Sequence, residues 1–214
     1  MSSRILRGLI VTVSAVAGLA CGDYSQPTSP APYKALPQTL IVRSSFTMLL
    51  GGTKARAVRW GPAHSSVEQR VSAVIGTDGG TMSIPGSDFA MNIPSGALAE
   101  PTTITVIAAA GSHVAYEMLP HGLRFLKPVT AVQGLQNTAA YGLRAGSSVR
   151  AAYLPEGRES IGLDDSASPS ELEAGATYYY GAQPVAENQV WIINHFSRYI
   201  LISGVWTEVP DEGR

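Results

Sequence analysis

The chain has 214 residues, of which 45% are hydrophobic and 14% charged, with 22 Gly, 14 Pro, one Cys and a formal net charge of −1. This length predicts one domain, or at most two. A charged fraction below the roughly 25% usual in globular proteins, together with abundant glycine and proline, favours a turn-rich β-protein. The near-neutral charge and the lack of a basic run in the sequence exclude an electrostatic nucleic-acid binder.

The N-terminal residues have the composition of a secretory signal peptide. Arg4 and Arg7 supply a positive region, and residues 8–19 form an apolar stretch of twelve residues. Because a helix of twelve residues is too short to span the roughly 30 Å of hydrocarbon in a bilayer, this stretch is not expected to cross a membrane. Residues 1–20 are therefore predicted to be a signal peptide that is removed on export.

The single cysteine, Cys21, closely follows this apolar stretch. Residues 18–21 resemble the lipobox of bacterial lipoproteins, although Gly18 stands where that motif prefers leucine. The resemblance implies that Cys21 is lipidated and attaches the exported chain to a membrane of the cell envelope, in a leaflet that the sequence leaves open. The alternative is an ordinary signal peptide cut near Cys21, which leaves a free thiol. Lipidation leaves no cysteine for a disulfide bond.

The remainder is mildly acidic, since 13 basic and 16 acidic residues are left after position 20, a net charge of −3. In the extension before the main domain, residues 40–50 predict either a strand or a short helix, and residues 57–60 a short strand. The expected divisions are a signal peptide (1–20), a Pro/Ser-rich tether (21–38), an N-terminal extension of open role (39–66), a β-domain (67–204) and a C-terminal tail (205–214).

The β-domain is marked by short β-rich runs set off by Gly, Pro, Asp and Asn every eight to twelve residues, a pattern typical of an antiparallel β-sandwich. Gly79 and Gly80 permit a turn with positive φ, and Gly96 allows a second tight turn. One helical turn is expected in residues 168–174, capped by Ser168 or Ser170. The predicted strands are 71–76, 81–84, 89–93, 102–107, 115–119, 129–134, 149–154, 177–181, 190–194 and 199–203.

Several segments resemble, in order, the ZU-five domain, the β-sandwich shared by zonula occludens proteins, netrin receptors and ankyrins. The similarity covers about 60% of the chain, residues 71–203. It implies an antiparallel β-sandwich whose work is protein–protein association, with a partner that the sequence does not identify. The segments are the Gly-Gly strand entry 74–81, Ile84-Pro85, the strand 89–93, the Pro-Ser-Gly-Ala-Leu turn 94–98, the strand 102–106, the proline-bounded segment 119–130 and the closing stretch 195–199.

The triplet His195, Phe196 and Ser197 carries the one candidate catalytic chemistry. In some death-domain members of the resembled family, such a triplet cleaves itself between Phe and Ser. Here the Ser197 hydroxyl would attack the Phe196 carbonyl carbon, with His195 accepting and returning the proton. Polar residues interrupt the apolar runs at this point, which predicts a β-bulge. The alternative is a strand with Phe196 in the core and its polar neighbours hydrogen-bonded.

The other candidate sites are weaker. His64, His113, His121 and His195 are scattered without paired spacing, so no metal site is predicted. The sequence has no phosphate loop, dinucleotide fingerprint or Gly-x-Ser-x-Gly elbow, so no cofactor is expected.

Two further patterns contain residue types found in binding sites. Asp164 and Asp165 have the ligand type that calcium prefers, but a pair of loop carboxylates is usually solvated. Residues 178–180 are three tyrosines, whose alternate side chains point to opposite faces of a strand and so make a poor carbohydrate platform. The sequence thus predicts a non-enzymatic, lipid-anchored envelope protein with an interaction or structural role, the alternatives being self-cleavage and glycan binding.

Overall fold

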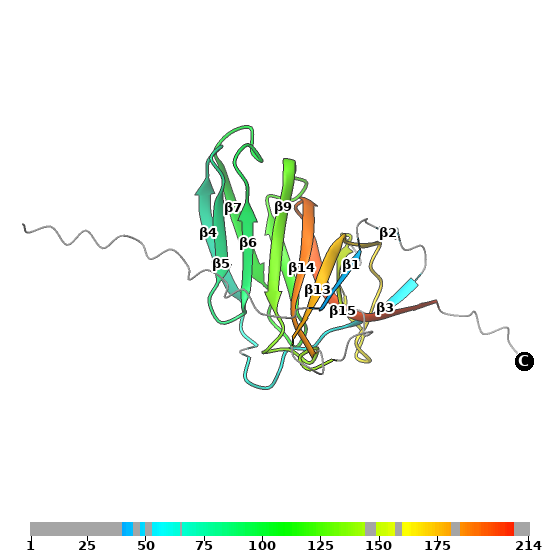
Figure 1. Cartoon of the computed structure of the whole chain (residues 1–214). Helices are drawn as coiled ribbons and strands as arrows, with labels where there is room; N and C mark the ends of the chain where they lie inside the picture. The colour runs from blue at the N-terminus through cyan, green and yellow to red at the C-terminus, as the bar shows by residue number, and fades with distance from the viewer. Residues whose placement is uncertain are drawn as a thin grey trace, which may run out of the picture. The chain divides into compact units, whose positions relative to one another are not determined.

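The computed structural model describes residues 40–44, 48–49, 53–64, 66–143, 149–156, 160–180 and 185–207. These residues belong to one compact unit and form two antiparallel β-sheets and no helix, which confirms the predicted all-β sandwich (Figure 1). Within these ranges no helix is both long and apolar enough to span a membrane. The predicted signal peptide, lipidated Cys21 and tether lie outside the described residues.

The first sheet has six strands. Antiparallel pairing continues from β1 at one edge to β5 at the other. In spatial order the strands are β1 (Leu40–Ser44), β13 (Gly175–Tyr180), β14 (Val185–His195), β9 (Arg124–Gly134), β6 (Phe89–Ile93) and β5 (Gly80–Ile84).

The second sheet has nine strands, seven of which follow one continuous path. That path runs β2 (Met48–Leu49), β12 (Glu171–Leu172), β10 (Arg150–Leu154), β15 (Arg198–Thr207), β8 (Ala115–Leu119), β7 (Thr102–Ala108) and β4 (Gln69–Ile75). Off this path, β3 (Thr53–Ala57) pairs with both β15 and β11 (Ser166–Ala167).

The main core lies between the sheets, because alternate residues of each strand point to opposite faces. Met91 of the first sheet and Ile104 of the second are both almost fully buried in it, and Trp191 is its largest buried side chain. On β7, Ile104 and Val106 are buried while Thr103 is exposed, as the two-residue alternation predicts.

A buried hydrogen-bond network links the two sheets. The Tyr116 hydroxyl of β8 donates to the Gln133 side-chain oxygen of β9. The Gln133 amide in turn donates to the Ser87 carbonyl at 2.6 Å and to the Gly134 carbonyl at 2.7 Å. Burial raises the pKa of Tyr116. Both the oxygen and the nitrogen of the buried Gln133 side-chain amide are thus hydrogen-bonded, as buried polar groups usually are.

The N-terminal extension supplies parts of both sheets. β1 pairs with β13 along five residues, and β2 pairs with β12. β3 lies against β15, where Ala55 and Ala57 join a second buried cluster with Leu154 and Ile202. Residues 40–50, predicted as strand or helix, therefore contribute β1 and β2 as strands.

One helical prediction is wrong. Residues 168–174 form no helical turn, because β12 pairs with β10 in an extended conformation. The Glu173 amide donates to the Ala151 carbonyl at 2.9 Å, and Leu172 is buried in the second cluster. Burial of Leu172 and these ladder bonds outweigh the local preference for a single capped turn, whose nucleation is unfavourable by itself.

The chain crosses between the sheets at Phe196 and Ser197, which join β14 of the first sheet to β15 of the second. Just before this crossing the pairing of β14 with β9 loses register between Ile193 and His195, as the predicted bulge requires. Ile193 pairs with Val129, and His195 pairs with Arg124. An advance of two residues along β14 therefore corresponds to five residues along β9. Phe196 is buried, but in the crossing rather than within a strand.

The turn between β4 and β5 provides a test of the fold. Gly79 has a φ of 78°, and a Cβ there would lie 2.2 Å from the Ile93 carbonyl oxygen, whereas a Cβ on Gly76 meets nothing within 4 Å. We expect Gly79→Ala to lower the free energy of unfolding by at least about 2 kcal/mol, and Gly76→Ala by less than about 1 kcal/mol, as measured by urea denaturation. Equal losses would contradict this account of the turn.

Candidate functional site

A cavity of about 410 Å³ lies beside the chain crossing and brings the three predicted catalytic residues to one place. His195, Phe196 and Ser197 all line it. The opposite walls come from β8, β10, β12 and the turn that precedes β9. Its volume falls in the range of small-molecule sites.

The backbone of the crossing is firmly held. The Phe196 amide donates to the Leu123 carbonyl at 2.8 Å, and the Phe196 carbonyl accepts from the Gly122 amide at 3.0 Å. One residue later the Ser197 carbonyl accepts from the Met118 amide at 3.0 Å. The carbonyl that self-cleavage would attack therefore already has one N–H donor, the kind of group that stabilises an oxyanion.

The His195 ring does not engage Ser197. It lies edge to face with Tyr153 at a centroid distance of 5.3 Å, and near Tyr199 at 6.3 Å. Among the described residues no hydrogen bond joins the Ser197 hydroxyl to this ring. The structure thus brings nucleophile and base into one cavity but not into contact, so proton transfer requires the ring to turn.

Two glutamates approach His195 from the second sheet. One ligand atom each of Glu171, Glu173 and His195 lies within 4.8 Å of the others. Glu173 is 3% exposed, and the Arg150 guanidinium donates to its backbone carbonyl at 2.9 Å. Burial lowers the pKa of Arg150, and the charge of Glu173 opposes that shift. Sequence spacing gave no signal of this cluster, since His195 is distant from both glutamates along the chain.

The cavity walls carry charges of both signs. His121 contacts the Glu117 carboxylate at 3.2 Å on one wall. Arg198 lines the same space, and its Nε is buried without a hydrogen-bond partner in the part of the chain that the structure describes. Burial raises the pKa of the neighbouring Tyr199, with smaller contributions from the negative charges of Glu173 and Glu171.

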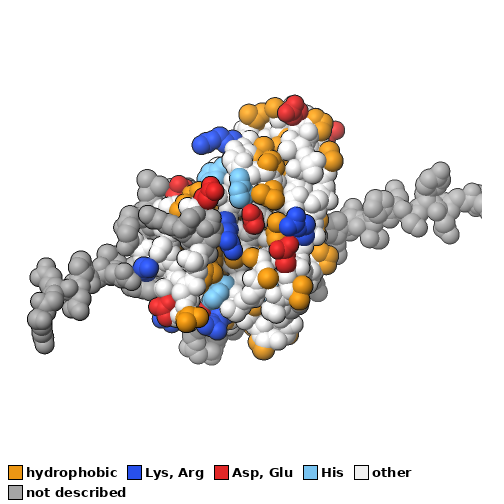
Figure 2. All heavy atoms as spheres, turned by 180° about the vertical axis from the view of Figure 1, so that it is seen from behind, with side chains coloured by type: hydrophobic (Ala, Val, Ile, Leu, Met, Phe, Trp, Pro, Cys, Tyr) orange, Lys and Arg blue, Asp and Glu red, His pale blue; other side chains and the backbone are white. Residues whose placement is uncertain are grey.

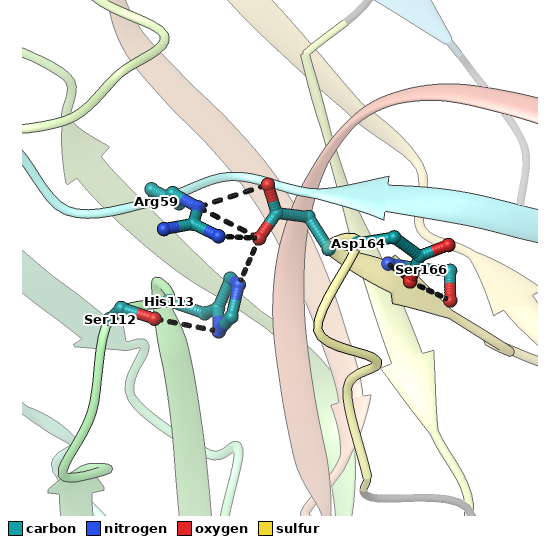
Figure 3. Close-up of polar contacts among 6 residues, drawn as sticks. Arg59, Ser112, His113, Asp164 and Ser166 are labelled. Atoms are coloured by element: carbon teal, nitrogen blue, oxygen red, sulfur yellow. Dashed lines mark hydrogen bonds and ion pairs between the residues drawn. The ribbon is translucent and has the colours of Figure 1, made fainter.

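A second polar cluster lies outside the cavity (Figure 3). Arg59 contacts the Asp165 carboxylate through Nε at 2.8 Å and through its terminal nitrogen at 2.6 Å. His113 Nε2 lies 2.9 Å from the same carboxylate, and the Ser112 hydroxyl 3.3 Å from His113 Nδ1. Ser112, His113 and Asp165 have the residue types of a nucleophilic triad. The Asp165 carboxylate, however, is also ion-paired with Arg59. The contacts instead join the loop before β11 to the segments around Arg59 and His113.

The two loop carboxylates considered for calcium are both engaged within the protein. Asp164 accepts from the Ser166 amide at 3.1 Å and from its hydroxyl at 2.7 Å. Hydrogen bonds from Arg59 and His113 lower the pKa of Asp165 to about 2. Asp165 also has a φ of 66°, a conformation that Asp and Asn tolerate better than most residues.

The tyrosines of β13 do not form an exposed platform. Tyr179 is fully buried, whereas Tyr178 and Tyr180 are half-buried. Among the side chains that the structure describes, Tyr141 is the exposed large aromatic residue. This geometry lends no support to carbohydrate stacking, which needs an accessible ring face.

The ion pair of Asp165 predicts a pH dependence of stability. Because the folded pKa of about 2 lies below the ordinary value of 3.8, the stabilisation is present above pH 3.8 and is lost as the pH falls towards 2. Asp165→Asn, which retains the backbone preference, should therefore destabilise the protein more at pH 6 than near pH 2. Urea denaturation across this range measures the difference. The exposed Glu100→Gln serves as control, and a loss for Asp165→Asn that is independent of pH would contradict the prediction.

Comparison with models of known protein families finds no match for this chain, and comparison with curated proteins finds no significant relative. The resemblance to the ZU-five domain therefore rests on the quoted segments alone. A fold by itself does not define a function, so the function is inferred from the geometry of the described residues.

Proposed function

We propose that this chain is an exported envelope protein, anchored through lipid on Cys21, whose β-sandwich binds a partner protein. The N-terminal sequence pattern supports the export and the anchor. The binding role is supported chiefly by one observation, the free edge of β4, and secondarily by the resemblance to a family of interaction modules.

β4 ends the second sheet, at the outer end of the sandwich in Figure 1. All seven of its residues pair in unbroken register with β7 on one side. Within the described sheets no strand pairs with its other side. Such an edge presents a row of backbone N–H and C=O groups to another chain.

The side chains of β4 do little to block pairing. Arg70, Ser72 and Val74 alternate on its exposed side, and Val74 is 70% exposed. Proteins usually protect an edge with several charges, a proline or a bulge, but β4 has one arginine and none of the other devices. An extended segment of a partner can therefore add a strand here, with main-chain hydrogen bonds providing affinity and Val74 an apolar contact.

Charge is not expected to select the partner. On the face shown in Figure 2, acidic, basic and histidine side chains lie among one another rather than in separate fields. A surface of mixed sign gives little long-range steering, so recognition would depend on backbone pairing and shape.

Photo-crosslinking from the edge strand tests this proposal. A photoreactive amino acid in place of Val74 should give a discrete crosslinked species in bacteria that export the chain, because the partner strand lies next to β4. The same group in place of the fully exposed Leu163 should not. A species with twice the chain's mass would identify a second copy as the partner. Absence of a discrete species at position 74, or equal yields at both positions, would contradict the proposal.

A second candidate is self-cleavage between Phe196 and Ser197, favoured by the Gly122 amide on the Phe196 carbonyl. Attack by the Ser197 hydroxyl would break the Phe196–Ser197 C–N bond, form an ester and transfer the hydroxyl proton through His195 to the leaving amine. Water would then hydrolyse the ester, which yields a Phe196 carboxylate and restores the hydroxyl.

Intact mass under denaturing conditions separates the two candidates. β15 pairs with β3, β8 and β10, so a cut fragment would remain bound under native conditions. A pure binding module predicts one uncut chain with or without Ser197→Ala. Self-cleavage predicts two fragments that part after Phe196 and disappear in Ser197→Ala, an outcome that would replace binding as the primary function.

A further inference from the structure

Three side chains with metal-binding atoms converge between the sheets. Glu171 pairs opposite Tyr153 in the extended β12, and Glu173 follows two residues later, so both point to the same side of the chain. Leu172 between them is buried in the cluster on the outer face of the second sheet. The two glutamates therefore face inwards, towards the end of β14, where His195 supplies an imidazole.

The surroundings of this cluster favour a cation. Two carboxylates lie within 4.8 Å of each other, one of them almost fully buried. Like charges at this separation repel, and burial strengthens the repulsion. The guanidinium of Arg150 offsets one of the two negative charges. A cation held between the two carboxylates would relieve their repulsion.

The cluster also opens onto the cavity. Glu171 and His195 line it, whereas Glu173 closes the site from behind. Arg198 lines the same cavity, where its positive charge favours an anionic ligand. An ion at the cluster would thus have protein ligands on one side and a position for water or a small anion on the other.

We propose that Glu171, Glu173 and His195 bind one divalent transition-metal ion, with its remaining coordination position facing the cavity. This set of one imidazole and two carboxylates suits zinc and its neighbours in the first transition row better than calcium or magnesium, which prefer oxygen ligands alone. Three protein ligands and an open position are typical of zinc sites that bind a small molecule or activate water. The proposal is independent of the edge-strand function.

Ring packing supports the geometry of the site. The edge-to-face contact of His195 with Tyr153 holds the imidazole against the strand that β12 pairs with. The Tyr199 hydroxyl donates to the His195 backbone carbonyl at 2.6 Å. Both contacts position the His195 ring before an ion binds.

Calorimetric titration of the full chain with Zn²⁺ tests the proposal. Cys21→Ser is included in every variant, because a free thiol also binds zinc. We expect one Zn²⁺ per chain, with affinity reduced at least about 100-fold by Glu171→Gln or His195→Asn, since loss of even an outer-shell partner costs 10- to 100-fold. The matched control His121→Gln removes an exposed imidazole from the same cavity and should leave the affinity unchanged.

Two further readouts keep the result interpretable. Circular dichroism should show that each variant keeps its β-sheet signal, so that lost binding is not lost folding. Co²⁺ should give a visible absorption band in the parent protein and not in Glu171→Gln. No binding by the folded parent, or an affinity that depends on His121 and not on Glu171 and His195, would overturn the proposal.

Discussion

The structure depends on how Phe196 carries the chain from one sheet to the other. Its side chain is buried in the main core beside Phe125, and its amide and carbonyl are both hydrogen-bonded to the turn before β9. This anchoring ends β14 in the first sheet and begins β15 in the second. Because an unpaired buried backbone group is costly, the segment has little freedom to shift. The cavity residues from His195 to Arg198 lie in or next to this crossing, and the turn before β9 that supplies another wall is hydrogen-bonded to it.

The crossing also explains why acidic and basic side chains line the same cavity. β15 lies in the middle of its sheet, with both faces covered: the main core on one side and the cluster built with β3 on the other. At the start of β15 polar side chains line the cavity instead. Arg198, the first residue of β15, pairs in register with Glu117 of β8. Ionisable groups are thus collected beside the chain crossing, while the outer side of β4, at the edge of the sheet, is paired with no strand among the described residues. The two places can serve different functions without sharing a residue.

Local patterns predicted the sandwich well because strand alternation and turn glycines are properties of short segments. The strands 89–93 and 115–119 have the predicted bounds, and Gly79 and Gly96 adopt positive φ. The site was harder to predict, because its geometry depends on one misjudged conformation. In a helical turn Glu171 and Glu173 would diverge, whereas in the extended β12 they share a side and reach His195. Likewise, nothing near Asp165 in the sequence signals that Arg59 and His113 meet it.

The most direct test of this account of the cavity is a crystal structure grown with Zn²⁺, with diffraction data collected on both sides of the zinc absorption edge. An anomalous peak is expected within coordination distance of Glu171, Glu173 and His195. A peak only at surface histidines such as His121, or clear density at the cluster with no ion in it, would contradict the proposed site and leave Glu173 as a structural partner of Arg150.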